Sequence, residues 1–218
     1  MNDTNLSSAV YRYLDSIILG NRLNQNELNS LLNFISNRQG KGIHYRNLYE
    51  ISDDEWYNPI YSYTGEKLTT KASKMHILGE YASFVLHHAK TTDKELIQIR
   101  DNTSSEFLDM IIDPKTFTGR FCCKRCTVAL WLHLSQLNTP QANQYMKVGL
   151  KWLKSERTGT GRWNQFPFFD TVLSLHFMNT AEAREELVYA LPALHKAVKT
   201  IDNEFDKRKH GIIKLLMN

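Results

Sequence analysis

The stretch Gly159-Thr-Gly-Arg-Trp-Asn-Gln-Phe-Pro-Phe-Phe-Asp170 decides the fold, because the way it opens recurs twice upstream. Each copy consists of Thr-Gly, a charged residue and a bulky one, and the earlier copies are Thr64-Gly-Glu-Lys67 and Thr118-Gly-Arg-Phe121. An apolar segment of helical length follows each copy. A repeated helix entrance of this kind predicts αα-hairpin units that stack side by side, each burying a face that its neighbour provides.

Apolar residues recur at helical spacing along most of the chain, as in Leu6, Val10, Leu14, Ile17 and Ile18. Strand-like alternation is rare, so we predict an all-α chain. The predicted helices cover 5–20, 25–37, 67–90, 93–112, 120–137, 140–155, 165–178, 182–202 and 204–216.

One section, 38–66, lacks this periodicity and is rich in aromatic residues. It carries Tyr45, Tyr49, Trp56, Tyr57, Tyr61 and Tyr63. We interpret it as an aromatic plug that packs over the core, with a lid over a binding cavity as the alternative.

Composition and length limit the class of protein. The 218 residues are enough for one domain with a sizeable core, and no Pro- or Gly-rich linker divides them, so we predict a single domain over 1–218. The formal net charge of +4 does not indicate nucleic-acid binding. The beginning of the sequence lacks the pattern of a signal peptide, and no apolar run is long enough to cross a bilayer. We therefore expect a cytoplasmic protein.

The segment 149–178 resembles a repeat unit of the terpenoid cyclase and protein prenyltransferase α/α-toroid superfamily. The resemblance lies in Gly149-Leu-Lys-Trp-Leu-Lys-Ser-Glu-Arg157, then Gly161-Arg-Trp-Asn-Gln-Phe-Pro-Phe-Phe169, then an apolar helix through Leu175. Segments 64–90 and 118–137 show weaker versions of it. The resemblance implies a prenyltransferase-like domain with an α/α toroid or an incomplete αα-barrel built from helical-hairpin repeats.

The chain also departs from that superfamily. The Asp-x-Asp-Asp motif of the cyclases and the Asp-x-Cys element of the prenyltransferase zinc site are both absent. These absences argue against squalene-cyclase-like protonation and against that zinc site. The chain is also short for a twelve-helix double ring, so the barrel would be open, reduced or closed by a partner. An open edge would allow a homodimer, unless the N-terminal helices cover it.

Three cations follow the glycines within two residues when the Thr-Gly copies are superposed. Lys67, Arg120 and Arg162 fall at the predicted helix starts, where a cation opposes the helix dipole unless an anion compensates. If the repeats stack in parallel, these cations and three helix N-termini would suit a phosphate or diphosphate. With Trp163 they form our predicted ligand-binding set. Pairing of each cation with a local carboxylate, such as Glu66 or Glu156, is the alternative.

Asp170 is the candidate catalytic carboxylate, because it lies beside an apolar helical stripe. In a cavity it would bind a metal or act as an acid or base. Alternatively, it accepts a hydrogen bond from a neighbouring helix or lies at the wet edge of the stripe. Four histidines, His76, His87, His88 and His133, are interpreted as structurally satisfied or as surface residues.

The three cysteines, Cys122, Cys123 and Cys126, lie within about one helical turn and cannot join distant segments by disulfides. As zinc ligands they would need a fourth group from another segment. Cys126 aligns with Ala72, which predicts a small apolar residue at a helix contact. Neighbouring cations and a helix N-terminus would instead make one of the thiols redox-active or sensitive to alkylation.

The sequence supports two main hypotheses of function and identifies no cofactor or metal. The first is a small prenyltransferase-like or terpenoid-cyclase-like domain that binds an amphipathic, prenyl-diphosphate-like or phosphorylated small molecule in a central cavity. The second is a non-enzymatic helical-repeat scaffold for protein–protein interaction.

Overall fold

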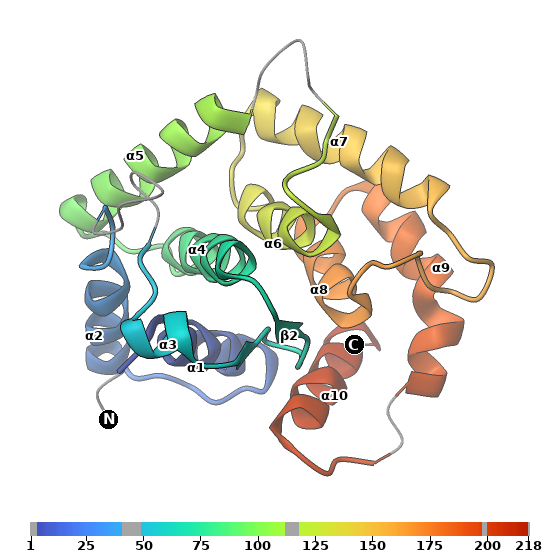
Figure 1. The fold of residues 1–218 in the computed structure, drawn as a ribbon, viewed down its shortest axis with the longest axis horizontal. Coiled ribbons are helices and arrows are strands. Elements are labelled where there is room, and N and C mark those ends of the chain that lie inside the picture. The colour runs from blue at the N-terminus through green and yellow to red at the C-terminus, as the bar shows by residue number, and fades with distance from the viewer. Residues whose placement is uncertain (1–3, 41–48, 112–117, 198–199, 218) are drawn as a thin grey trace. The chain divides into compact units, whose positions relative to one another are not determined.

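The computed structural model describes residues 4–40, 49–111, 118–197 and 200–217. Within these residues the chain forms ten helices and one two-stranded sheet, which confirms the all-α class (Figure 1). The chain divides into two compact units. The first unit comprises 1–62 and 67–111, and the second comprises 63–66 and 112–218. The single domain over 1–218 stays a prediction, because two compact units can belong to one domain.

The first unit is built around two buried helices, α1 and α4. Helix α1 packs on α2 and α4, and α5 packs on α2 and α4. The strands pair antiparallel, with Ile60 opposite Leu68. The elements are α1 (Leu6–Ile18), α2 (Gln25–Ser36), α3 (Asp53–Tyr57), β1 (Ile60–Tyr61), β2 (Lys67–Leu68), α4 (Lys71–His88) and α5 (Lys94–Ile111).

Two buried charges fix the short helix α3 within the first unit. The Glu55 carboxylate accepts hydrogen bonds from the backbone N–H groups of Leu6, Ser7 and Ser52, and so ties the start of α3 to the start of α1. The Lys74 ammonium donates to the carbonyl of Glu55 at 2.9 Å and to two further carbonyls at the end of α3. Both charges therefore satisfy helix termini that would otherwise lack hydrogen-bond partners.

The second unit has α6 and α8 at its core. These helices pack on each other, α7 packs on α6 and α9, and both α9 and α10 pack on α8. Gly149 on α7 admits the indole of Trp131, because a Cβ at this position would lie 2.6–2.8 Å from the ring. The elements are α6 (Lys124–Leu134), α7 (Pro140–Ser155), α8 (Phe168–Met178), α9 (Ala181–Ala197) and α10 (Glu204–Met217).

The three Thr-Gly copies form turns, but the helices begin later than the sequence predicts. The glycines of the copies, at 65, 119 and 161, all have φ between 66° and 95°. The following helices start at Lys71, Lys124 and Phe168, and their N-cap residues are Thr70, Cys123 and Pro167. The threonines of the copies therefore do not cap these helices. The left-handed glycines hold the chain in a turn, and regular helix begins only after it.

Section 38–66 contains more regular structure than predicted, namely α3 and β1. Its aromatic residues differ in burial: Tyr49 and Tyr63 are buried, whereas the exposed fractions of Tyr57 and Tyr61 are 75% and 40%. Tyr45 lies outside the described residues. Only some of the aromatic residues in this section are therefore buried, as an aromatic plug over the core requires.

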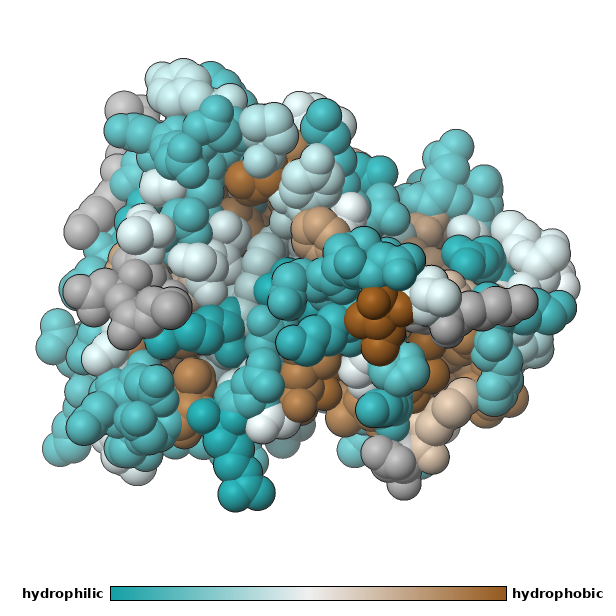
Figure 2. All heavy atoms as spheres, turned by 90° about the horizontal axis from the view of Figure 1, so that it is seen from below, coloured by the Kyte–Doolittle hydropathy of each residue, from teal (hydrophilic) through white to brown (hydrophobic). Residues whose placement is uncertain are grey.

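Figure 2 shows one face on which hydrophilic residues predominate and hydrophobic ones form separate small spots. None of the helices in the described ranges is long and apolar enough to cross a bilayer.

Candidate functional site

The glycine-rich segment between α7 and α8 is a tight turn. Arg157 and Trp163 face each other in an isolated antiparallel bridge, and the Thr158 N–H donates to the Arg162 carbonyl at 2.9 Å. Gly161 has φ of 80°, and a Cβ there would lie 3.1 Å from the side chain of a residue on α9. The segment that decides the fold is therefore fitted closely to a neighbouring helix.

A buried carboxylate holds this turn in place. Glu186 on α9 is 2% exposed and accepts a hydrogen bond from the Trp163 indole N–H at 2.8 Å. The Arg157 guanidinium donates to both oxygens of the same carboxylate, at 2.8 and 3.1 Å. Trp163 is buried, and its indole N–H is already engaged by Glu186. Its role in ligand binding stays a prediction.

The predicted cationic set does not lie at helix starts. Lys67 lies on β2 of the first unit, whereas Arg120 and Arg162 belong to the second unit and precede α6 and α8 by several residues. Each of these two arginines stacks on an aromatic ring, Arg120 on Trp152 at 4.4 Å and Arg162 on Phe168 at 4.2 Å from the ring centroid. Because these cations do not lie at helix N-termini, the geometric reason for predicting a diphosphate site there does not hold.

Other cations of the second unit have carboxylate partners, as the local-pairing alternative expects. Lys124 contacts Glu156 at 2.8 Å, and Arg125 contacts Glu66 at 3.3 Å. The Lys124 pair lowers the pKa of the Glu156 carboxyl through the hydrogen bond from the ammonium. These pairs reduce the net positive charge that would be available to the predicted phosphate or diphosphate site.

The candidate catalytic carboxylate is buried. Asp170 is 4% exposed and lies in the first turn of α8, where a negative charge interacts favourably with the helix dipole. This position is compatible with the predicted hydrogen-bonding role. A catalytic role for Asp170 stays a prediction.

The N-terminus of α6 brings two thiols together. Cys123 is the N-cap residue and is exposed, whereas Cys126, in the first turn of the helix, is fully buried. Their Sγ atoms lie 3.5 Å apart. The neighbouring Cys122 is exposed and has φ of 48°, a left-handed conformation that is uncommon outside glycine. The burial of Cys126 agrees with its predicted place at a helix contact.

The environment separates the acidities of these thiols. The hydrogen bond between the two thiols, helped by backbone N–H groups of Cys126 and Arg125, lowers the pKa of Cys123 to about 5. Conversely, the same hydrogen bond and burial raise the pKa of the Cys126 thiol far above its ordinary value. Burial also raises the pKa of Cys122. Cys123 is therefore the more acidic thiol of the pair and Cys126 the less acidic one.

The sequence predicted these cysteines as metal ligands, as a helix contact at Cys126 or as a sensitive thiol, but not as a dithiol pair. A Cys-x-x-Cys pair that spans the N-cap and the third helical residue places both sulfurs over one turn, and this signal could have found the pair. Among the described residues of the second unit, no group of three His, Cys, Asp or Glu side chains brings its ligand atoms within 4.8 Å.

The adjacent histidines of α4 have separate partners. The His87 Nε2 lies 2.7 Å from the Ser104 hydroxyl, and the His88 Nδ1 lies 2.8 Å from the Tyr13 hydroxyl. Adjacent helical residues point about 100° apart, so the two rings serve different contacts. This arrangement agrees with the interpretation of satisfied histidines.

His76 and His133 are buried, each in a different unit. Burial lowers the pKa of both rings, to about 3 for His133. Both are therefore neutral at physiological pH.

A groove of about 540 Å³ lies in the first unit, between α2 and the connection from α4 to α5. Amide and hydroxyl groups line much of it, including those of Gln25, Asn29 and Thr92, with Leu28 and Leu32 as apolar contacts. No cluster of ionisable side chains accompanies it among the described lining residues. This groove does not match the apolar central cavity that the toroid resemblance implies.

Comparison of the chain with family models, with curated proteins and with solved structures finds no match. Function is therefore inferred from the geometry of the second unit.

Proposed function

We propose that the second unit carries a thiol–disulfide redox site formed by Cys123 and Cys126. The observation that carries this proposal is the pair of sulfurs 3.5 Å apart on one helical turn, the outer exposed and the inner buried. A disulfide requires the sulfurs to approach to about 2.05 Å, and the pair is already within side-chain adjustment of that distance. An exposed attacking thiol and a shielded resolving thiol are what two-step exchange requires.

The reaction begins with Cys123. Its thiolate attacks one sulfur of a disulfide R–S–S–R′, so the Cys123–S–R bond forms, the S–S bond breaks and R′–S⁻ leaves. The Cys126 sulfur then attacks the Cys123 sulfur, its proton passes to the departing R–S⁻, and the Cys123–Cys126 disulfide forms. The protein dithiol loses two electrons, and the substrate disulfide gains them.

The surroundings of α6 support these roles. Backbone N–H groups at the helix N-terminus stabilise negative charge on the N-cap sulfur, which lowers the pKa of the Cys123 thiol. Burial keeps Cys126 protonated until the mixed disulfide brings an acceptor thiolate close to it. Free thiols also agree with the predicted cytoplasmic location, where the reducing poise keeps cysteines reduced.

The test uses 2-hydroxyethyl disulfide as the probe and intact-mass spectrometry as the readout. The reduced wild-type protein should lose two hydrogens and acquire a Cys123–Cys126 disulfide. Cys126→Ser should instead trap one mercaptoethanol group on Cys123, and Cys123→Ser should do neither. Cys122→Ser is the matched control and should behave as the wild type. A trapped group on Cys122 in the Cys126→Ser protein would overturn the proposal.

The prenyltransferase-like cavity, the α/α-toroid architecture and the scaffold function stay predictions. The stacked guanidinium groups of Arg120 and Arg162 are the feature that an anionic, amphipathic ligand could use. The double variant Arg120→Ala with Arg162→Ala tests this, because it should abolish binding of a prenyl diphosphate while leaving the protein folded. Under the scaffold hypothesis, binding of a protein partner should survive the double variant.

A further inference from the structure

Arg120 is the cation closest in sequence to Cys123 and Cys126 for which the described residues supply no carboxylate partner. It is exposed and lies three residues before Cys123. Among the described residues, no carboxylate lies within salt-bridge distance of its guanidinium. Its contact is with the indole of Trp152, 4.4 Å from the ring centroid. The charge of Arg120 is therefore available to a ligand.

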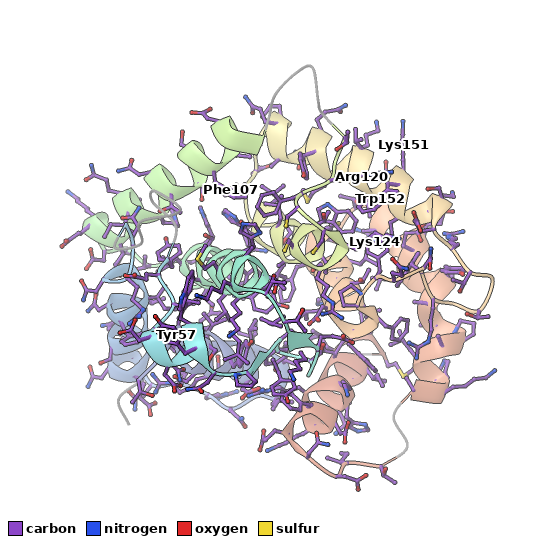
Figure 3. The ribbon with its side chains drawn as sticks, viewed as in Figure 1. Tyr57, Phe107, Arg120, Lys124, Lys151 and Trp152 are labelled. Atoms are coloured by element: carbon purple, nitrogen blue, oxygen red, sulfur yellow. The ribbon has the colours of Figure 1, made fainter. Side chains whose placement is uncertain are left out.

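The neighbouring cations differ from Arg120 in this respect. Lys124 is paired with Glu156, which also accepts the Trp152 indole N–H at 3.1 Å. Arg125 is paired with Glu66. Figure 3 shows Arg120, Trp152 and Lys124 close together where α7 passes the start of α6. Among the described residues, the Arg120 guanidinium thus rests on the Trp152 indole without a carboxylate partner, three residues before Cys123 in the chain.

The stacking arrangement suits recognition of a carboxylate. A guanidinium group that rests one face on an indole keeps its N–H edges directed outward, and these edges match the two oxygens of a carboxylate. The indole also restricts the rotation of the side chain, so less conformational entropy is lost on binding. Three residues span at most about 11 Å between the Cα atoms of Arg120 and Cys123. A carboxylate a few bonds from a reacting sulfur is within this reach.

We infer that Arg120 selects disulfides whose substituents carry a carboxylate, by holding that group while the substrate sulfur meets Cys123. Arg120 is thus a specificity-determining residue of the redox site. This inference rests on the proposed function, because it names the substrate class of the same thiol pair.

The experiment compares three small disulfides on the Cys126→Ser protein, which retains each mixed disulfide for counting by mass. Glutathione disulfide carries carboxylates, 2-hydroxyethyl disulfide is neutral, and cystamine is cationic. Arg120→Gln should slow the reaction with glutathione disulfide about 5- to 10-fold and leave the neutral probe unchanged. Arg120→Lys keeps the charge without the planar fork and should give an intermediate rate.

The matched control is Lys151→Gln. Lys151 is exposed on α7, one residue from Trp152, and its removal changes the net charge by the same amount. Figure 3 places it beside Arg120 and Trp152. It should change the glutathione disulfide rate less than twofold, because a general field effect is screened by salt.

The outcomes separate the two claims. If Cys123 reacts with none of the three disulfides, the proposed redox function fails. If it reacts with all of them, but Arg120→Gln slows them equally or not at all, only the selectivity inference fails. An equal effect of Lys151→Gln would assign the preference to bulk charge and would also overturn the inference. Circular dichroism of each variant confirms that the helices are retained.

Discussion

The reactivity of the Cys123 thiol should depend on pH differently in the folded and in the urea-unfolded chain. In the folded protein, the Cys126 hydrogen bond and the helix N–H groups lower the pKa of Cys123 to about 5. In the unfolded chain the thiol should titrate near its ordinary pKa of about 8.5. Two opposing effects then set the rate of attack on a neutral disulfide: the fraction present as thiolate and the nucleophilicity of that thiolate.

The magnitudes predict that the two rate profiles cross. At about pH 6 the thiolate fraction is about 300 times larger in the folded protein. A thiolate of lower pKa is a weaker nucleophile, and a Brønsted coefficient of about 0.4–0.5 makes the folded one roughly 25- to 55-fold slower per ion. The folded protein should thus react roughly 5- to 10-fold faster near pH 6. The rates should be about equal near pH 7 and reversed at about pH 8.

The assay uses the Cys122→Ser protein and a brief reaction with 2-hydroxyethyl disulfide, stopped by acid. Trypsin cleaves after Arg120, Lys124 and Arg125, so Cys123 and Cys126 fall on different peptides and can be quantified separately. Cys126→Ala removes the hydrogen-bond donor and should move the folded profile toward that of the unfolded chain. Cys126→Ser retains an O–H donor and should move it less.

A folded profile that rises up to about pH 8.5, parallel to the unfolded one, would refute the reasoning. A folded profile unaffected by Cys126→Ala would refute the assignment of the effect to Cys126. A single rate measured at neutral pH does not distinguish the folded from the unfolded thiol, because the larger thiolate fraction and the weaker nucleophilicity of the folded thiol nearly cancel there.

Three further predictions concern the second unit and a helical control in the first. Glu186→Gln should lower the free energy of unfolding by about 1–3 kcal/mol in a urea titration, because the partly buried Arg157 guanidinium loses the closer of its two carboxylate partners, Glu186, and retains Glu185; an unchanged free energy of unfolding would contradict this. Gly149→Ala should lower the free energy of unfolding by about 1–3 kcal/mol and change the tryptophan fluorescence, because the added Cβ displaces Trp131. In Gly79→Ala the added Cβ meets open space, so this variant should raise the free energy of unfolding by about 0.5–1 kcal/mol. Equal effects of the two substitutions would be inconsistent with the packing. Burial lowers the pKa of His133 to about 3, so the contribution of its neutral ring to the free energy of unfolding is fully present above about pH 6.5 and is lost as the pH falls toward about 3. His133→Gln should make the free energy of unfolding fall less steeply over this pH range. An unchanged slope would argue against a buried neutral ring.

Local sequence signals predicted the helices because their causes act over a few residues. The apolar spacing of Leu6, Val10 and Leu14 predicted α1, and all three are buried. Thr139-Pro140 predicted the start of α7, where the Thr139 side chain accepts the Ala142 N–H. Hydrogen bonds between residues three or four apart and an apolar stripe are both written in the local sequence.

Helix starts after the Thr-Gly copies were predicted too early, and this error carried into the site. Lys67, Arg120 and Arg162 were aligned as helix-start cations, yet the left-handed glycines before them extend the turns by several residues. Whether a glycine adopts positive φ depends on its surroundings, because glycine populates both signs about equally.

The sequence alone thus determined that the chain is helical, where most helices lie, and that three thiols fall within one turn. The tertiary structure decided which charges remain available and which thiol is exposed. Lys124 meets Glu156 across 32 residues of chain, whereas Arg120 meets the indole of Trp152 and, within the described part of the chain, no carboxylate. Packing buries Cys126 and leaves Cys123 at the surface. Such partners are chosen by the docking of distant helices, and short-range periodicity carries no information about that docking.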